Sequence, residues 1–396
     1  MEMKAGFAQS VITPPLPIQL AGHRGPRMAT SIGDDLLAKA LVCSDRDTLY
    51  AIVSLDLIWL PRRFIRKVRD LISRSSAIRP ENVMIACTHT HSGPDTLNWY
   101  AFAPPIAGWW MEWLAQMVAS TVYLALNNVD DCTAVRGQAR FDLAVNRRRP
   151  VDGQIYRLPY EMGHTDQRLS ILQFSAGDRS LGGIVHAAMH PVVLGADSHA
   201  ISGDWCGIAM AELGTRAGGI WLFLNGAAGD NNPKIWSGHN NYDAMCSVAR
   251  AAADCAEQAL NSARPFAVET MGSRILDGVY EERSHPYLTV EQRLRTSEEG
   301  GLYVESQVLR LGNMPFVAMG GECLFDTARI IESAVGDCLV VSYANDYVGY
   351  LPTREHYGEG GYEPAASMLS ESGAEAYVSA AIANAEHIMG RNKIPT

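Results

Sequence analysis

Short apolar runs alternate with longer amphipathic stretches along the whole chain. The short runs are rich in Val, Ile and Leu and end at polar or glycine-containing turns, which is typical of strands. We expect strands at Leu36–Cys43, Thr48–Leu57, Val83–Cys87, Arg168–Phe174, Gly183–Ala188, Ile220–Leu224, Glu305–Leu311 and Val317–Met319. We expect helices at Pro61–Ser75, Trp109–Asn127, Cys206–Arg216, Asn241–Asn261, Leu324–Val335 and Gly373–Met389. Because strands and helices are intermixed throughout, the pattern predicts an α/β sandwich.

The connections between predicted elements are short. Only Ser44-Asp45-Arg46-Asp47 separates the first two predicted strands, which is hairpin spacing, so at least part of the sheet is antiparallel. No internal repeat, low-complexity segment or long linker is visible in the sequence. The expectation is therefore one domain that spans residues 1–396.

Composition and charge narrow the class of protein. With 47% hydrophobic and 19% charged residues the chain is typical of a globular enzyme, and its net charge of −10 argues against nucleic-acid binding. The N-terminus lacks the pattern of a secretory signal, and Glu112 and Gln116 interrupt the most apolar stretch, so no membrane anchor is expected. The eight cysteines are scattered without a C-x-x-C pair, which predicts reduced thiols and a cytoplasmic location.

The string Thr88-His89-Thr90-His91-Ser92-Gly93-Pro94 follows one of the predicted buried strands. Two imidazoles two residues apart at a strand end point the same way, because strand side chains alternate with period two. A neutral imidazole is the commonest metal ligand. An isolated H-x-H is also typical of a polar turn, so the other loops decide between a metal site and a structural role.

Further loops after predicted strands carry residues that could complete a metal site. The residues concerned are His190, Asp230, Glu322 and Tyr350. Two histidines and a carboxylate are a common set for catalytic zinc, with an open position for water. Zinc lowers the pKa of that water to about 7. The pattern therefore favours a zinc hydrolase over a set of unrelated turns.

Several other residues are open to a structural and a functional interpretation. His186 lies inside a predicted strand and is expected in the core, Asp204 is placed to cap the following helix, and His23 is a further candidate for the site. Arg147 stands in a run of three arginines that would also suit a solvated basic patch. Aromatic residues either roof an apolar substrate pocket or fill the core beside an amphipathic helix: Trp99, Tyr100, Phe102, Trp109, Trp110 and Trp113.

Taken in order, these motifs resemble the neutral ceramidase family, the neutral/alkaline non-lysosomal ceramidases and their bacterial relatives. The resemblance covers nearly the whole chain. It rests on Ala5-Gly6-Phe7, Ile12-Thr13-Pro14-Pro15, Leu20-Ala21-Gly22-His23, Thr88–Pro94, Asn146-Arg147, His190-Pro191, Ile201-Ser202-Gly203-Asp204, Gly321-Glu322 and the pair Tyr350 and Tyr362. It implies a layered α/β sandwich with two central mixed β-sheets flanked by helices.

The same resemblance implies a site. One Zn²⁺ per chain would be bound by its four ligands, which are His89, His190, Glu322 and Tyr350. The substrate carbonyl would be lined by His91, Arg147 and Tyr362. Asp230, on the glycine-rich loop, is a further catalytic candidate.

The chain departs from the family pattern in two ways. Asn232 stands where the family's G-D-x-S-P string has its serine. Asparagine cannot serve as an acyl-accepting nucleophile, so a covalent serine route is not expected and the zinc-water route remains. The sequence also shows no C-terminal immunoglobulin-like domain after the catalytic region, and a substrate other than membrane ceramide is expected.

The predicted function is a zinc-dependent hydrolase. It would cleave a linear amide (C–N) bond of a small or amphiphilic substrate with a metal-activated water. Two alternatives stay open: an esterase or lactonase that uses the same site, and a zinc-binding protein without catalysis. The expected partner is a small-molecule substrate, with no nucleic acid and no membrane anchor, and the sequence is compatible with a homo-oligomer.

Overall fold

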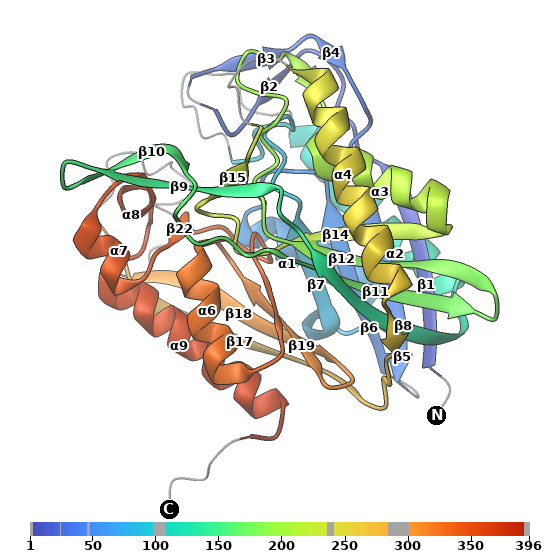
Figure 1. The fold of residues 1–396 in the computed structure, drawn as a ribbon. Helices are drawn as coiled ribbons and strands as arrows, with labels where there is room; N and C mark the ends of the chain where they lie inside the picture. Colours follow the sequence, from blue (N-terminus) through green and yellow to red (C-terminus); the bar gives the residue numbers. More distant parts are fainter. Residues whose placement is uncertain are drawn as a thin grey trace, which may run out of the picture.

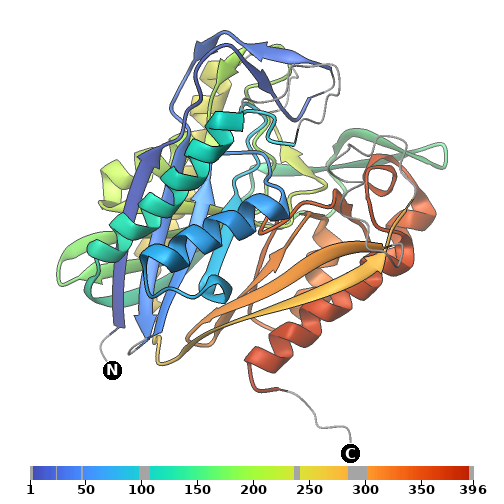
Figure 2. The ribbon, with the colours of Figure 1, turned by 180° about the vertical axis from the view of Figure 1, so that it is seen from behind.

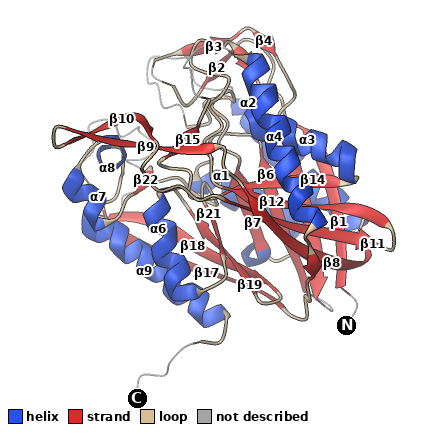
Figure 3. Ribbon diagram, viewed as in Figure 1, coloured by secondary structure: helices blue, strands red, loops and turns tan. Residues whose placement is uncertain are grey.

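Two β-sheets stack face to face, and helices cover the outer face of each (Figure 1, Figure 3). The computed structural model describes residues 3–23, 25–45, 48–97, 108–235, 241–283 and 301–391. Within these residues the order of layers is helices, a nine-stranded sheet, a four-stranded sheet, and helices again. The predicted layered α/β sandwich with two mixed sheets is confirmed.

The larger sheet has the strand order β14-β12-β11-β8-β1-β5-β6-β7, and β16 pairs with β8. Its strands are β1 (Met3–Val11), β5 (Leu37–Asp45), β6 (Thr48–Leu55), β7 (Val83–Cys87), β8 (Asp130–Arg140), β11 (Arg168–Ala176), β12 (Arg179–Ala187), β14 (Ile220–Asn225) and β16 (Arg264–Pro265). Neighbours are antiparallel except β6–β7 and β12–β14. The predicted hairpin is confirmed, with Leu41 of β5 paired to Ile52 of β6.

The smaller sheet has the order β17-β18-β19-β21, with β19 and β21 parallel. Its strands are β17 (Met271–Glu281), β18 (Gly301–Leu311), β19 (Met314–Met319) and β21 (Leu339–Val341). The longer helices are α1 (Arg62–Ser75), α2 (Gly108–Asn127), α3 (Asp204–Ala217), α4 (Tyr242–Asn261), α6 (Phe325–Val335) and α9 (Glu371–Ile388). Helices α1 to α4 lie on the larger sheet, whereas α6 and α9 lie on the smaller one (Figure 1, Figure 2).

Short elements cluster at one end of the sandwich, above the ends of β7, β12 and β14 (Figure 1). The short strands are β2 (Ile18–Leu20), β3 (Arg27–Ala29), β4 (Ser31–Ile32), β13 (Ala200–Ile201), β15 (Asn231–Pro233), β20 (Glu322–Cys323) and β22 (Tyr350–Leu351). The hairpin β9 (Ala144–Val151) and β10 (Gln154–Tyr160) joins them, as does the short helix α8 (Tyr362–Ala365), which contacts β10 and β22. The other short helices are η1 (Pro80–Asn82) and α7 (Arg354–Glu359). This end of the sandwich holds the predicted site residues.

The continuous apolar runs of the central strands follow from burial on both faces. Leu41 and Ile52 pack between the two sheets, whereas their neighbours Val42 and Val53 pack beneath the helices. Since a strand alternates its side chains, both sets must be apolar when both faces are covered. This explains why the pattern predicted these strands correctly.

The predicted helices agree with the structure to within two residues at either end. Five strands of seven or more residues were not predicted from the pattern, namely β1, β8, β9, β10 and β17. The strands β8 and β17 mix polar and apolar residues and are half exposed over much of their length. Within the described part of the chain, no helix is both long and apolar enough to cross a membrane.

A buried ion pair links α1 to both sheets. Arg69 donates from Nη1 and Nη2 to the two carboxylate oxygens of Glu305 on β18, at 2.7 and 2.8 Å. Its Nε donates at 3.0 Å to the carbonyl oxygen of Val83, where β7 begins. Both charged side chains are almost fully buried. Removing one partner would leave the other charge buried and unpaired.

We therefore expect Arg69→Leu to lower the free energy of unfolding by about 3–5 kcal/mol. The control is Arg354→Leu, because Arg354 forms a similar two-point pair with Glu375 on the exposed surface. Exposed pairs contribute about 0–1 kcal/mol. Urea denaturation of both variants measures the difference, and equal effects would contradict the structural role of the buried pair.

Candidate metal centre

Three imidazoles from two strand ends converge on one carboxylate. Nε2 of His89 and Nε2 of His190 each lie 3.3 Å from Oε2 of Glu322. Nε2 of His91 lies 3.1 Å from Nε2 of His89. One nitrogen from each histidine can be chosen so that all three lie within 4.8 Å of one another. The three histidines are close enough to act as ligands of a single metal ion, and Glu322 lies beside two of them.

A left-handed residue in the loop after β7 helps to bring the first two histidines together. β7 ends at Cys87, and His89 has a φ of 72°. The sequence argument treated His89 and His91 as neighbours on an extended strand, and this explanation is wrong. They converge because the backbone turns at His89, in a conformation that L-residues adopt at a cost.

Hydrogen bonds on the far side of two rings fix the nitrogens that face the centre. Nδ1 of His89 lies 2.9 Å from the carbonyl oxygen of Ile58, and Nδ1 of His190 lies 2.5 Å from that of Ala228. A carbonyl oxygen can only accept, so each Nδ1 carries a proton, and Nε2 is the ring nitrogen that faces Glu322 and is available to a metal ion. Metal-ligating histidines are usually oriented in this way. The donor set therefore fits a divalent metal ion.

The electrostatics of the cluster agree with this arrangement. Burial lowers the pKa of His190 to about 4, and the nearby charge of Arg147 adds to the effect. Burial also lowers the pKa of His91 well below its ordinary value. For Glu322 burial alone would raise the pKa, but the facing His89 and His190 outweigh it and hold the pKa well below the ordinary value. The centre thus combines two histidines of lowered pKa, His91 and His190, with a carboxylate whose pKa is also lowered.

Two tyrosines that the sequence argument did not assign hold the carboxylate in place. The hydroxyl of Tyr347 donates to Oε1 of Glu322 at 2.7 Å, and that of Tyr343 donates to Oε2 at 3.3 Å. The Tyr343 ring also stacks on His89, with 3.9 Å between ring centroids. Both lie on the loop from which only Tyr350 was selected. Nothing in the local sequence distinguishes them as partners of Glu322.

Arg147 connects the histidine cluster to the C-terminal part of the chain. Its Nη1 lies 3.5 Å from Nε2 of His190 and donates to Oδ1 of Asn232 at 3.1 Å. Its Nη2 donates to the Tyr350 hydroxyl and its Nε donates to Oε1 of Glu363, both at 2.9 Å. The side chain is almost fully buried, so the alternative of a solvated basic patch is wrong for Arg147.

The two predicted tyrosines lie beside the cluster. Tyr350 is the register partner of Glu322 in the small parallel sheet β20–β22. Tyr362 begins α8, and its ring meets that of Tyr350 edge-on at 5.5 Å between centroids. The guanidinium of Arg147 lies 5.9 Å from the Tyr362 ring. The structure thus brings Tyr350, Tyr362 and Arg147 to the same place, while their roles stay predictions.

Asp230 supports the site from behind. Its carboxylate accepts from Nδ2 of Asn146 at 3.1 Å and from the backbone N–H of Phe325 at 2.9 Å. It therefore joins β9 to the start of α6, directly after the strand that carries Glu322. Burial raises the pKa of Asp230 to about 6. These contacts describe a positioning group, and the predicted catalytic role of Asp230 stays a prediction.

Two other candidates have structural roles. Asp204 is not the N-cap of α3, because Gly203 holds that position; the Asp204 carboxylate instead accepts from the backbone N–H groups of Val193 and Leu194, after His190. His186 lies 2.9 Å through Nε2 from the carbonyl oxygen of Val340 and joins the two sheets, as expected for a core residue.

His23 packs against the cluster. Its ring centroid lies 5.1 Å from that of His91. Burial lowers the pKa of His23 to about 3, with further contributions from the charges of Arg27 and Arg157. Gly22 (φ 93°) allows this approach, because a Cβ at that position would lie 2.3 Å from Nδ1 of His91.

The aromatic residues around the start of α2 differ in their burial, and some lie outside the described part of the chain. Trp99, Tyr100 and Phe102 lie outside the described residues. Trp110 is buried in the core beneath α2, whereas Trp109 and Trp113 are exposed. The core interpretation is therefore correct for Trp110, and the interpretation as a pocket roof is untested for the others.

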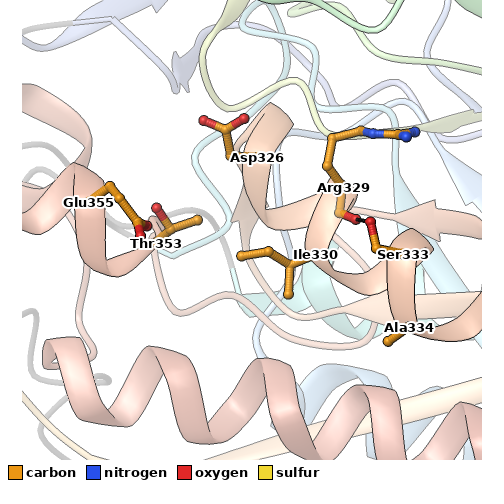
Figure 4. A pocket seen from close by; sticks show the side chains of 7 residues that line it. All are labelled: Asp326, Arg329, Ile330, Ser333, Ala334, Thr353 and Glu355. Carbon is orange, nitrogen blue, oxygen red and sulfur yellow. Dashed lines mark hydrogen bonds between the residues drawn. The ribbon is translucent and has the colours of Figure 1, made fainter.

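A separate surface hollow of about 640 Å³ lies between α6 and the start of α7 (Figure 4). It is lined by Asp326, Arg329, Ile330, Ser333, Ala334, Thr353 and Glu355. None of these side chains belongs to the histidine cluster. The hollow is thus distinct from the candidate metal centre.

Comparisons with known proteins agree with the fold. The model of the family described as neutral/alkaline non-lysosomal ceramidase, N-terminal, matches residues 5–278. The crystal structure of neutral ceramidase from Pseudomonas aeruginosa matches at a TM-score of 0.83 and 18% identity, over 100% of this chain and 76% of that chain. A ceramidase complexed with C2 matches with the same values. Among proteins of curated function, none matches this sequence.

The hydrogen bond from Tyr347 to Glu322 gives a direct test of the centre. Losing a group that orients a metal ligand costs about 10–100-fold in metal affinity, so we expect Tyr347→Phe to weaken metal binding by that factor. Tyr357→Phe is the control, because its hydroxyl binds Ser367 and the carbonyl oxygen of Leu369, away from the cluster. Competition with a chelator measures both, and unchanged affinity in Tyr347→Phe would contradict the proposed ligand set.

Proposed function

This chain belongs to the neutral/alkaline non-lysosomal ceramidase family, and on that premise we propose that it is a zinc-dependent hydrolase of linear amides. Membership of the family implies a hydrolase that acts on an amide bond. The observation that carries the zinc proposal is the pair of Nε2 atoms, on His89 and His190, that face one oxygen of Glu322 at 3.3 Å. Two histidines with a carboxylate are a common catalytic zinc set.

The proposed ligands are His89, His190, Glu322 and Tyr350, with one ion per chain. Zn²⁺ held there would supply a water whose pKa is lowered to about 7 and would polarise the substrate carbonyl. Burial raises the pKa of Tyr350 well above its ordinary value, and Arg147, which donates to the phenol oxygen at 2.9 Å, partly offsets this effect. His91 lies within reach of the same centre, and its proposed role is different.

His91 is proposed as the general base. Its Nε2 faces the cluster, and burial keeps the ring neutral, so Nε2 can accept a proton from the attacking water. The same nitrogen would then return the proton to the leaving amine. An amine needs this protonation more than an alcohol does, which is why an acid–base group beside the metal site suits amide cleavage.

Arg147 and Tyr362 are proposed to stabilise the negative charge that develops on the carbonyl oxygen. A guanidinium has five N–H donors, and the contacts with Asn232, Tyr350, Glu363 and Nε2 of His190 leave one of them available. The Asn232 amide accepts from Arg147 and has no ionisable oxygen. An acyl-enzyme on this residue is therefore not part of the proposal.

Metal removal tests the proposed function. We expect chelator-treated, metal-free protein to lose hydrolysis of N-acyl amines, and stoichiometric zinc to restore it, because the water nucleophile depends on the ion. Circular dichroism before and after treatment serves as the control for folding. Elemental analysis that shows no metal in a protein still cleaving these amides at the original rate would refute the proposal.

Tyr362 provides a test of the transition-state donors. Removing one such donor typically costs about a hundredfold or more in rate, so Tyr362→Phe should retain zinc and lower kcat by about that factor. The control is Tyr156→Phe on the exposed strand β10. If Tyr362 only packs the loop, Tyr362→Phe will keep kcat within a few-fold of the unmodified enzyme, and the catalytic assignment fails.

A further inference from the structure

The β9–β10 hairpin places two guanidinium groups opposite each other beside the site. Arg157 of β10 is the register partner of Arg148 of β9. Residues directly opposite in an antiparallel pair have their side chains on the same face, and like charges in this position are destabilising. Nearby anions would therefore stabilise such a pair of arginines.

Arg148 forms ion pairs with two carboxylates of the protein. Its Nη1 lies 2.7 Å from Oε2 of Glu363, and its Nη2 lies 3.0 Å from Oε2 of Glu359. Arg157 differs: among the residues described in the structure, no carboxylate lies within ion-pair distance of its guanidinium. Its Cζ instead lies over the ring of Tyr362, 4.8 Å from the centroid.

Tyr362 connects this unpaired cation to the candidate metal centre. The Tyr362 ring also contacts the Tyr350 ring, with 5.5 Å between the two ring centroids. Arg157 is exposed to solvent, yet its charge contributes to the lowered pKa of the buried His23. Arg157 therefore lies close enough to the candidate metal centre for its charge to act on a substrate bound there.

We propose that Arg157 binds a carboxylate group of the substrate, so that the amides preferred by this site are anionic. The proposal rests on the proposed amide hydrolysis and adds the substrate class. The planar guanidinium can donate two parallel hydrogen bonds to the two oxygens of a carboxylate. A bound carboxylate would also offset the repulsion between Arg157 and Arg148. On a chain whose net charge is −10, such a site would attract anions locally.

Two matched pairs of substrates test the proposal. N-octanoylglycine is compared with N-octanoylethanolamine, which carries a hydroxyl in place of the carboxylate on the amine part. N-octylsuccinamic acid is compared with N-octylbutanamide, which lacks the carboxylate on the acyl part. In each pair the ratio of kcat/KM for the anionic to the neutral amide measures the preference. We expect a preference of about tenfold or more in at least one pair, the factor given by a charge-assisted hydrogen bond.

The decisive variant is Arg157→Gln, and its control is Arg149→Gln. Arg149 pairs with Tyr156 in the same hairpin, so it lies on the opposite face and loses the same charge. We expect Arg157→Gln to bring the ratio close to one and Arg149→Gln to leave it unchanged. Raising the salt concentration should also reduce the preference of the unmodified enzyme.

Other outcomes would overturn the proposal. A ratio near one in both pairs, or a preference that survives in Arg157→Gln, shows that Arg157 does not bind the carboxylate. An equal loss of activity on anionic and neutral amides shows that Arg157 only supports the Tyr362 ring. If no amide is cleaved at all, the proposed function fails separately. Isothermal titration calorimetry with the same pairs then decides the matter, because anionic compounds must bind more weakly to Arg157→Gln than to Arg149→Gln.

Discussion

Burying a carboxylate beside two imidazoles is the constraint on which the rest of the site depends. A buried charge is costly unless it is paired and hydrogen-bonded. Glu322 meets part of this requirement through the hydroxyls of Tyr343 and Tyr347, and a metal ion shared with Nε2 of His89 and His190 would supply the counter-charge. These groups follow β7 and β12 or lie on the loop before β22, so the ends of both sheets must meet at one point. The layered sandwich provides this meeting point.

A second buried charge organises the side of the centre that would face the substrate. Arg147 is held by Glu363, and through Asn232 and Tyr350 it fixes the glycine-rich loop and the small parallel sheet. A network of buried charges is stable only when every member is satisfied. Arg157, at the edge of this network, is exposed to solvent and has no carboxylate within ion-pair distance among the described residues. Its guanidinium is therefore available to a ligand.

Most of the fold could be predicted from the sequence, and part of the site could not. The strands β5 and β6 are buried on both faces, so their apolar runs are unambiguous, whereas β8 and β17 are half exposed and give a mixed pattern. The residues His89, His190 and Glu322 follow predicted strands and were found from that position. Tyr343 and Tyr347 were missed because their contact with Glu322 is tertiary. No local pattern predicts which of several loop tyrosines reaches a carboxylate.

The central claim is that the cluster holds one zinc ion. Anomalous diffraction from crystals of the protein, recorded on both sides of the zinc absorption edge, tests it directly. The account predicts one strong peak per chain, in contact with Nε2 of His89, Nε2 of His190 and a carboxylate oxygen of Glu322. Zinc-supplemented crystals without a peak at this position, or with the zinc bound by other residues, would contradict it.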